Sequence, residues 1–413
     1  MTSSPTDTPR RTGRSRRRTL LLAVLAAGAL TAGLLGATAA QRHGSGPNGG
    51  RPPGDRRQAA LQRNADALLA LGVTGVQARL STADGPDLTA VSGVADLAGR
   101  QPVPADGHFR IASVTKAFVA TVVLQLVAEG RLALDDSVES RLPGVVAGNG
   151  NDGRAITVRD LLQHRSGLHD DYPDPASAED FQQHRNDSTT AAQTVARATA
   201  HRPDFAPGTD WGYNNTGYVL LGMIVERVTG HPWHQEVQDR IARPLGLTHT
   251  SWPGATPTLP QPHAATYQRF GDGPLVDVTE QVGAGTNGEA GLISTTADLD
   301  RFFRALLGGR LLPPDQLARM QQTVPVGKDF EALMPGARDG LGLFARPLSC
   351  GGTYWGHEGG DSGWITATGV TADGRRAVTV SLSGVQIASP DDVPKIAQAE
   401  NTLVDDALCN AGR

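Results

Sequence analysis

The feature that most constrains the fold is an almost wholly apolar run that ends at Leu126 and follows the stretch Phe109-Arg-Ile-Ala-Ser-Val-Thr-Lys116. A helix that is apolar on every side has to lie inside the protein. We therefore predict a buried helix that begins at this stretch. Ser113 and Lys116 stand three residues apart at its start, where helical neighbours have Cβ atoms roughly 5–6 Å apart.

A hydroxyl and an amine held together in apolar surroundings form a nucleophile and its base. The alternative is an ordinary helix start, with Ser113 near the cap and Lys116 reaching outward to solvent. The spacing alone does not separate the two interpretations, so the rest of the chain has to decide between them.

The first 40 residues predict an exported protein. A cluster of six arginines precedes an apolar run that begins at Leu20 and continues to about Ala40, and small residues stand at Ala37-Thr-Ala39. This order is typical of a cleavable signal peptide. An uncleaved membrane anchor is the alternative, because the run is close to the length that spans a bilayer. Residues 41–57 are rich in Gly and Pro and are expected to form a flexible linker.

The charge and cysteine content narrow the class of partner and compartment. Residues 1–40 contain six arginines and one aspartate, so the remaining chain carries 32 basic and 41 acidic residues. This negative balance argues against nucleic acid or anionic lipid as a partner. The two cysteines, Cys350 and Cys409, fit one structural disulfide in an oxidising compartment. A zinc site would need more cysteines or a tight histidine cluster.

Hydrophobic periodicity divides residues 58–413 into a sheet part and a helical insert. Residues 58–133 contain a helix followed by two strand-like runs joined at an Asp-Gly turn, and residues 286–413 end in a strand meander and a last helix. Between them, residues 134–285 show short helical patterns and no clean strand alternation. We predict an α/β (α+β) fold, in which an antiparallel sheet flanked by helices carries an inserted, mostly α-helical subdomain. A cleft is expected where the two parts meet.

Three stretches carry residues suited to chemistry. They are Ser113-Val-Thr-Lys116, the segment around Tyr213-Asn-Asn215, and His357-Glu-Gly-Gly360. A nucleophilic serine needs a base, a group that passes the proton to the leaving group, and donors for the oxyanion. Lys116 and Tyr213 are candidates for the proton transfers, and a glycine-rich strand end lets backbone N–H groups approach a substrate closely.

In this order, the three stretches resemble those of the serine D-alanyl-D-alanine carboxypeptidase and class C β-lactamase family, whose fold is β-lactamase/transpeptidase-like. The family motifs are Ser-x-x-Lys, Tyr-x-Asn, and a third motif of His or Lys, then usually Thr, then Gly. The resemblance extends from about residue 57 to the end of the chain. The version here, with His opening the third motif, is most similar to secreted D-Ala-D-Ala carboxypeptidases of actinobacterial type.

The resemblance implies a serine carboxypeptidase acting on peptidoglycan-type peptides. Ser113 would attack the carbonyl of the penultimate D-alanine and release the terminal D-alanine from an acyl-enzyme. Lys116 and Tyr213 would share the base and proton-shuttle roles, and His357 would supply a polar or positive group near Tyr213. β-Lactams would acylate the same serine.

The resemblance also implies the binding residues. Asn215 would hydrogen-bond the substrate amide, and the N–H groups of Ser113 and Gly360 would hold the oxyanion. Glu358 and Gly359 complete the predicted substrate-binding stretch. No metal or organic cofactor is implied, and a monomer is expected.

One departure from the family pattern puts the substrate in doubt. Glu358 stands where the family usually has a hydroxyl that helps to hold the terminal carboxylate of the substrate. Two like charges about 4 Å apart cost on the order of 4 kcal/mol at an effective dielectric of about 20. Either Glu358 points away, or it is protonated, or the substrate has no free carboxylate there, which would favour an esterase or amidase. Arg346 is a candidate for the missing cation.

Several other interpretations remain. A β-lactamase or esterase of the same fold, or a penicillin-binding sensor, would use the same three motifs. Gly360-Asp-Ser-Gly363 mimics a chymotrypsin-like nucleophile motif, but the chain lacks the matching upstream histidine stretch. His231 and His234 lack acidic or cysteine companions for a metal, so we expect surface residues. His164 and His169 are expected to stabilise loops.

Overall fold

The computed structural model describes residues 53–171, 175–282, 287–385 and 392–410. The predicted signal peptide, residues 1–40, lies outside these ranges. The linker predicted over residues 41–57 ends earlier than expected, because helix α1 (Pro53–Leu69) begins at Pro53. Proline favours the first helical position and Asp55 favours the positive end of the helix dipole, so a helix can start inside this Gly/Pro-rich segment.

The described residues form a nine-stranded antiparallel sheet built from both ends of the chain, which confirms the predicted fold class. The strand order is β2-β1-β15-β14-β12-β11-β10-β9, and β13 also pairs with β14. Val73 lies opposite Val385 and Thr82 lies opposite Arg376, so the first long strand pairs with the last. The strands are β1 (Val73–Thr82), β2 (Leu88–Gly93), β9 (Val324–Pro325), β10 (Arg338–Asp339), β11 (Phe344–Pro347), β12 (Thr353–Gly356), β13 (Glu358–Asp361), β14 (Trp364–Thr371) and β15 (Arg376–Val385).

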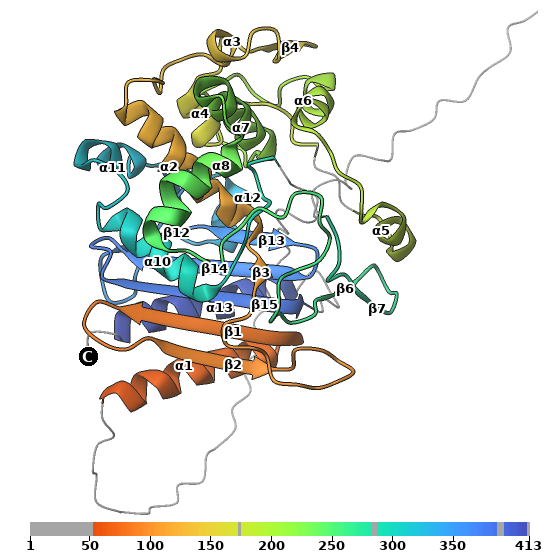
Figure 1. The fold of residues 1–413 in the computed structure, drawn as a ribbon, viewed down its shortest axis with the longest axis vertical. Coiled ribbons are helices and arrows are strands. Elements are labelled where there is room, and N and C mark those ends of the chain that lie inside the picture. Colours follow the sequence, from red (N-terminus) through yellow and green to blue (C-terminus); the bar gives the residue numbers. More distant parts are fainter. Residues whose placement is uncertain (1–52, 172–174, 283–286, 386–391, 411–413) are drawn as a thin grey trace, which may run out of the picture.

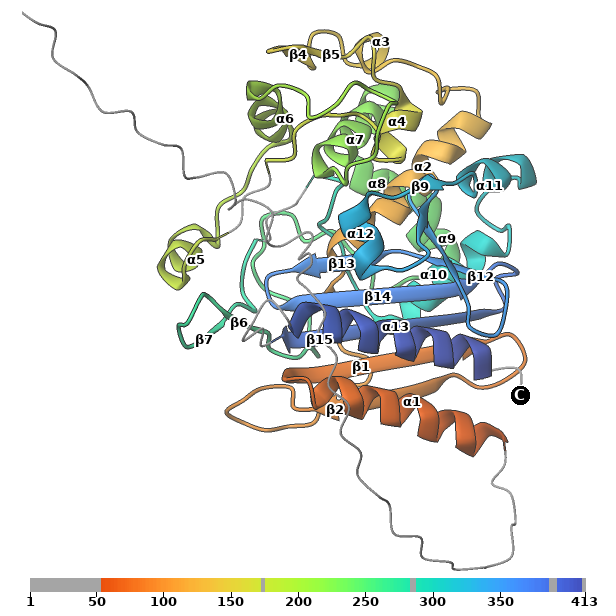
Figure 2. The ribbon, with the colours of Figure 1, turned by 180° about the vertical axis from the view of Figure 1, so that it is seen from behind.

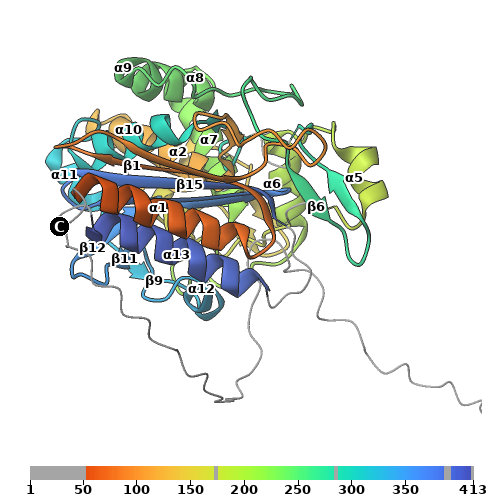
Figure 3. The same ribbon diagram turned by 90° about the horizontal axis from the view of Figure 1, so that it is seen from below.

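Helices α1 and α13 (Asp392–Asn410) lie side by side on one face of this sheet, as Figures 2 and 3 show. Their apolar side chains, among them Leu68 and Leu403, pack with Val378 and Val380 of β15 in one buried cluster. Burying apolar surface in this way contributes roughly 25 cal/mol per Å² of area removed from water. The predicted helical cover over the sheet is therefore present.

The opposite face is covered by α10 (Thr296–Leu307), and α2 (Thr115–Ala128) lies above α10 in Figure 1. Every side chain of α2 from Thr115 to Leu124 is buried, as the apolar run predicted. The rings of Phe118 in α2 and Phe302 in α10 stack with centroids 3.7 Å apart. These contacts fix the start of α2, and with it Ser113, above the sheet.

The predicted insert, residues 134–285, stands above the sheet and is mostly helical (Figure 1). It also contains two short antiparallel pairs, β4 with β5 and β6 with β7. These strands are two or three residues long, too short to produce an alternating sequence pattern. The elements are α3 (Val138–Arg141), β4 (Ala147–Gly148), β5 (Asn151–Asp152), α4 (Val158–Leu162), α5 (Ala178–His184), α6 (Ala191–Ala200), α7 (Asn215–Thr229), α8 (Trp233–Val237), the π-helical turn η2 (Gln238–Ala242), α9 (Arg243–Leu245), β6 (Tyr267–Arg269) and β7 (Leu275–Asp277).

The remaining elements connect the insert to the sheet. The short strand β3 (Phe109–Arg110) pairs with β8 (Ile293–Ser294) and leads into the 3-10 turn η1 (Ala112–Val114). Helices α11 (Pro314–Met320) and α12 (Lys328–Leu333) follow α10. A disulfide joins Cys350 to Cys409, as predicted, and ties the end of α13 to the turn between β11 and β12. Within the described ranges, none of the helices has the length and apolarity needed to cross a bilayer.

Candidate active site

Ser113 lies in η1, one turn before the buried start of α2. The amine Nζ of Lys116 donates a hydrogen bond to Ser113 Oγ at 2.9 Å, and Lys116 is completely buried. The residue before the serine, Ala112, has a φ of 45°, in the left-handed region that a residue with a Cβ seldom occupies. Such local strain persists where the surroundings hold it in place, and it is common at active sites. The structure therefore brings the Ser113 hydroxyl and the Lys116 amine into the contact that a nucleophile and its base require.

The surroundings of Lys116 make its amine a usable base. Nζ also donates to Asn215 Oδ1 at 2.8 Å and to the backbone carbonyl of Glu289 at 2.7 Å. Burial lowers the pKa of Lys116 to about 7, although the charges of Glu289 and Asp170 raise it. A substantial fraction of the amine is then neutral near pH 7 and can accept the proton of Ser113.

Tyr213 stands over the same lysine. Its ring centroid lies 5.0 Å from Lys116 Nζ, and the ring is held between His164, at 4.4 Å, and Phe330, at 5.8 Å. Burial raises the pKa of Tyr213, and a hydrogen bond with Ser113 only partly offsets that rise. Tyr213 is therefore a neutral phenol that can donate or relay a proton, whereas Lys116 is the better base.

Asn215 is the first residue of α7, and both polar atoms of its side-chain amide are hydrogen-bonded. Oδ1 accepts from Lys116, and Nδ2 donates to Asp170 Oδ2 at 2.9 Å. Asp170 Oδ1 also accepts from the backbone N–H groups of Asn215 and Thr216, which satisfies donors that the first turn of α7 leaves free. A direct bond from Asn215 to the substrate amide stays a prediction. What the structure assigns to Asn215 is the orientation of Lys116.

His357 lies between β12 and β13, with its ring 6.5 Å from that of Tyr213. Burial and the charge of Lys116 lower the pKa of His357 to about 3, so the positive charge allowed for by the sequence is absent. Nδ1 contacts the carbonyl of Glu358 at 2.5 Å and so carries the proton. Nε2 then holds a lone pair, is buried, and has no hydrogen-bond partner among the described residues. His357 is thus a neutral acceptor on the Tyr213 side of the site.

Glu358 points away from Ser113. Its Oε1 lies 3.4 Å from Arg346 Nη1, and Arg346 also donates to Asn401 of α13. Burial and the neighbouring Glu358 raise the pKa of Glu400, also on α13, to about 8. The sequence left three possibilities for Glu358, and the structure shows the first of them, in which its side chain points away from the substrate. Arg346, the candidate for the missing cation, is not free for a substrate carboxylate, because Glu358 and Asn401 both contact its Nη1.

The two glycines of β13 differ in their surroundings. A Cβ on Gly359 would lie 2.2 Å from the carbonyl oxygen of Ile111, so only glycine lets β13 approach the turn that carries Ser113. Gly360 is exposed, and a Cβ there would meet no atom within 4 Å. Space for a substrate therefore exists beside Gly360. Its role as an oxyanion donor stays a prediction.

Sequence reasoning missed two acids around this site, half-buried Asp170 and buried Glu289. Asp170 and Glu289 contribute the negative charge near Lys116, and His164 Nδ1 accepts from the backbone N–H of Asn214 at 3.0 Å. His164 thereby supports the Tyr213 loop, in line with its expected structural role. Asp170 gives no sequence signal, because the groups that it binds lie on another element. Glu289 directly precedes a stretch that resembles the family, and that position is its only signal.

The chymotrypsin-like and metal-site interpretations find no support in the geometry of the described residues. Ser362 lies in the turn between β13 and β14, where its N–H donates to Asp361 Oδ1. His231 pairs with Glu236, His234 stacks on Trp252, and His169 pairs with Asp204. Within the described ranges, no three His, Cys, Asp or Glu side chains are arranged to hold a metal ion.

The family profile described as Beta-lactamase matches residues 61–401. The chain belongs to the beta-lactamase family. Its described residues carry the serine, lysine and tyrosine of a serine hydrolase of this fold in one site. In this beta-lactamase family protein, the matched region includes every residue of that site, from Ser113 to Gly360.

Relatives in sequence and structure agree with this membership. Penicillin-binding protein 4 of Amycolatopsis lactamdurans is 33% identical over 250 residues, which cover 56% of this chain and 61% of that protein. A D-stereospecific amidohydrolase from Streptomyces sp. is 40% identical, with a TM-score of 0.74 over 81% of this chain and 97% of its own. The D-amino acid amidase from Ochrobactrum anthropi SV3 is 28% identical, with a TM-score of 0.72 over 86% and 99%.

Proposed function

We propose that this protein hydrolyses amides of D-amino acids that carry a free amino group, through an acyl-enzyme on Ser113. The pairing of Arg346 with Glu358 carries this proposal. A carboxypeptidase has to hold the carboxylate of its leaving residue, and here the candidate cation is neutralised by an acid. A neutral amide leaving group makes no such demand.

The charges near Ser113 support the same substrate class. Half-buried Asp170 and buried Glu289 lie on the Lys116 side of the site, where burial raises the pKa of both and the charge of Lys116 favours their ionised forms. Negative groups attract an ammonium and repel a carboxylate. Two solved relatives are described by their titles as a D-stereospecific amidohydrolase and a D-amino acid amidase, which agrees with this choice.

We infer an order of proton transfers from the contacts among Ser113, Lys116 and Tyr213. Neutral Lys116 accepts the proton of Ser113 as Oγ bonds to the carbonyl carbon. The carbon–nitrogen bond then breaks, Tyr213 protonates the leaving amine, and Lys116 returns its proton to Tyr213. Water next attacks the ester carbonyl and gives one proton to the lysine–tyrosine pair, from which Ser113 recovers its own. Each residue ends in its starting protonation state.

D-Ala-D-Ala carboxypeptidase activity is the second candidate. The three motifs favour it, as does the similarity to a penicillin-binding protein, which also supports acylation by β-lactams. A β-lactamase or esterase would use the same serine. We further propose that the protein is exported, on the strength of its N-terminal pattern. Fusion of residues 1–40 to a reporter that is active only outside the cytoplasm tests this, and a silent reporter contradicts it.

A panel of four substrates tests the reaction. It consists of D-phenylalanine amide, a peptide ending in D-Ala-D-Ala, nitrocefin, and a p-nitrophenyl ester. We expect the D-amide to be hydrolysed faster than its L-enantiomer and faster than the D-Ala-D-Ala peptide, with no turnover by Ser113→Ala. Labelled penicillin should attach to the wild type and not to Ser113→Ala. Rapid D-alanine release with no amide turnover would establish the carboxypeptidase instead.

A further inference from the structure

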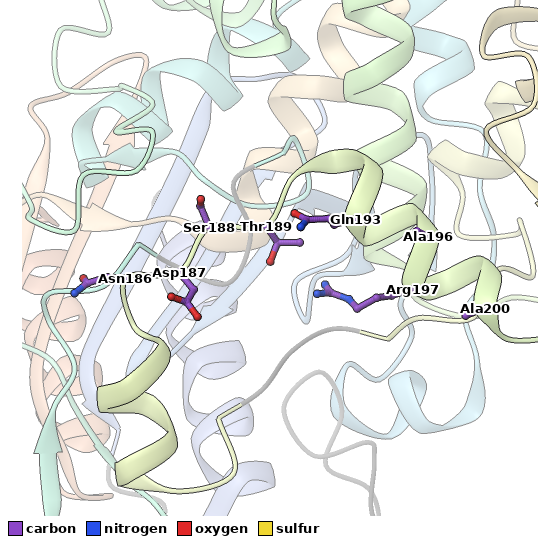
Figure 4. A pocket seen from close by; sticks show the side chains of 8 residues that line it. All are labelled: Asn186, Asp187, Ser188, Thr189, Gln193, Ala196, Arg197 and Ala200. Carbon is purple, nitrogen blue, oxygen red and sulfur yellow. The ribbon is translucent and has the colours of Figure 1, made fainter.

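A polar hollow of about 850 Å³ lies beside α6, outside the residues assigned above (Figure 4). The segment from Asn186 to Thr189, which precedes α6, forms one side of it. Gln193 and Arg197 of α6 project toward that segment from the other side. A hollow of this size is large enough for part of a small peptide.

Hydrogen bonds join this hollow to the catalytic centre. Asn287 Nδ2 donates to the backbone carbonyl of Thr189 at 2.7 Å, and Asn287 N–H donates to Glu289 Oε2 at 3.0 Å. The carbonyl of Glu289 in turn accepts from Lys116. The wall of the hollow and the base of the reaction therefore lie within a few residues of each other in space.

The hollow is lined by one cation and one acid. The cation is Arg197, for which no ion pair is found in the described part of the chain, and its Nε is buried without a hydrogen-bond acceptor among the described residues. The acid, Asp187, is mostly exposed and contacts His184, whose Nδ1 lies 2.7 Å from its Oδ2. Because Thr190 donates to Gln193 Oε1, the Nε2 group of Gln193 is left to donate to a ligand.

We propose that this hollow is a carboxylate subsite, in which Arg197 binds a carboxylate that the substrate carries away from the scissile bond. A guanidinium beside an amide donor matches the planar geometry of a carboxylate. The inference rests on the proposed function and extends it: the acids beside Lys116 take the ammonium of the D-amino acid, and Arg197 takes an anion further along the molecule. The carboxylate belongs either to the leaving peptide or to the side chain of the acyl residue.

Two matched pairs of substrates distinguish these sources. The first pair is D-Ala-Gly-Gly and its C-terminal amide, which differ only in a carboxylate on the leaving side. The second is D-glutamic acid α-amide and D-glutamine α-amide, which differ only in a carboxylate on the acyl side. KM and kcat are measured for the wild type, Arg197→Gln, Arg197→Lys, and Arg202→Gln. Arg202 follows α6 but does not line the hollow, which makes it the matched control.

We expect Arg197→Gln to raise KM about tenfold for the carboxylate member of one pair, since a hydrogen bond to a charged group is worth at least about this factor. The uncharged member should change by less than about twofold, Arg197→Lys should recover part of the loss, and Arg202→Gln should behave as wild type. The pair that responds identifies the source of the carboxylate. Equal effects of Arg197→Gln on both members of both pairs, or the same loss in Arg202→Gln, would overturn the subsite.

Calorimetric binding separates this inference from the proposed reaction. The same compounds are titrated into Ser113→Ala, which cannot form the acyl-enzyme, with and without Arg197→Gln. A carboxylate preference that disappears with Arg197→Gln supports the subsite even where no amide is hydrolysed. If Kd depends neither on the substrate carboxylate nor on Arg197, the subsite is refuted, whatever the turnover of the uncharged amides.

Discussion

Arg346 Nη1 lies 3.4 Å from Glu358 Oε1, so the acid of the third motif points toward the α13 side of the sheet, where it pairs with this guanidinium. Asn401 of α13 accepts a second hydrogen bond from the same guanidinium at 2.6 Å. Both elements that could hold a substrate carboxylate are therefore lacking: Glu358 replaces the motif hydroxyl, and these contacts occupy the cation.

Replacing that acid should change the substrate preference. In Glu358→Thr, the hydroxyl usual for the family is restored and Arg346 loses its carboxylate partner. We expect kcat/KM for a peptide ending in D-Ala-D-Ala to rise at least about tenfold relative to D-phenylalanine amide, since one charge-assisted hydrogen bond is worth about this factor. Glu358→Gln removes the charge without supplying the hydroxyl and should give a smaller gain. An unchanged ratio in Glu358→Thr would contradict this account.

The pKa of Lys116 should appear in the pH dependence of acylation. Only the neutral amine accepts the proton of Ser113, so protonation below pH of about 7 removes the base. The acylation rate should therefore be low at acidic pH, rise through about pH 7, and level off above it, as single-turnover measurements can test. Lys116→Met should lower the plateau about 10³-fold. Tyr213→Phe should lower the plateau and leave the midpoint in place, whereas a flat profile in the wild type would exclude Lys116 as the base.

Glu289 should set the position of that midpoint. Its negative charge raises the pKa of Lys116, so removing the charge lets burial lower the pKa further. We expect the midpoint of the acylation profile to move to lower pH in Glu289→Gln. Glu226→Gln removes an exposed acid from α7 and serves as the control for a nonspecific charge effect. A midpoint that moves to higher pH in Glu289→Gln would show that the two groups are not coupled as described.

The disulfide should contribute to stability rather than to chemistry. Cys350 and Cys409 are 59 residues apart in the sequence, and a cross-link over such a loop stabilises a protein by up to about 4 kcal/mol in the chain-entropy account. The double variant Cys350→Ser/Cys409→Ser should unfold at a lower denaturant concentration by a corresponding amount. Its kcat at 25 °C should match the wild type, because neither cysteine contacts the site. Denaturant titration followed by fluorescence and an amidase assay measure the two quantities.

The sequence predicted the residues of the site better than their charges. Ser113, Tyr213 and His357 come together as expected, because each motif has a local pattern that resembles the family. The charge of His357 could not be predicted, since it depends on burial by residues distant in the sequence. The same is true of Asp170, which binds the start of α7 across 45 residues of chain.

The fold was predictable to a similar degree. The long strands β1, β14 and β15 have enough residues to show an apolar pattern, and the structure confirms them. The short strands β9 and β10 at one end of the sheet and the strand pairs of the insert do not, because two or three residues cannot display a period of two. Glycine and proline near Pro53 favour a linker, so the predicted linker extends past the observed start of α1.

The pairing of β1 with β15 determines the order in which this protein can fold. Val73 finds its partner only when Val385 is available, so the centre of the sheet cannot close while the chain is still being synthesised. Contacts between residues so far apart in sequence are slow to form, because the intervening chain loses entropy first. The strand that bears the third motif, β13, pairs with β14, which in turn pairs with β15. A chain that lacks β15 therefore has the serine but lacks the strand against which β14, and through it the third motif, is held.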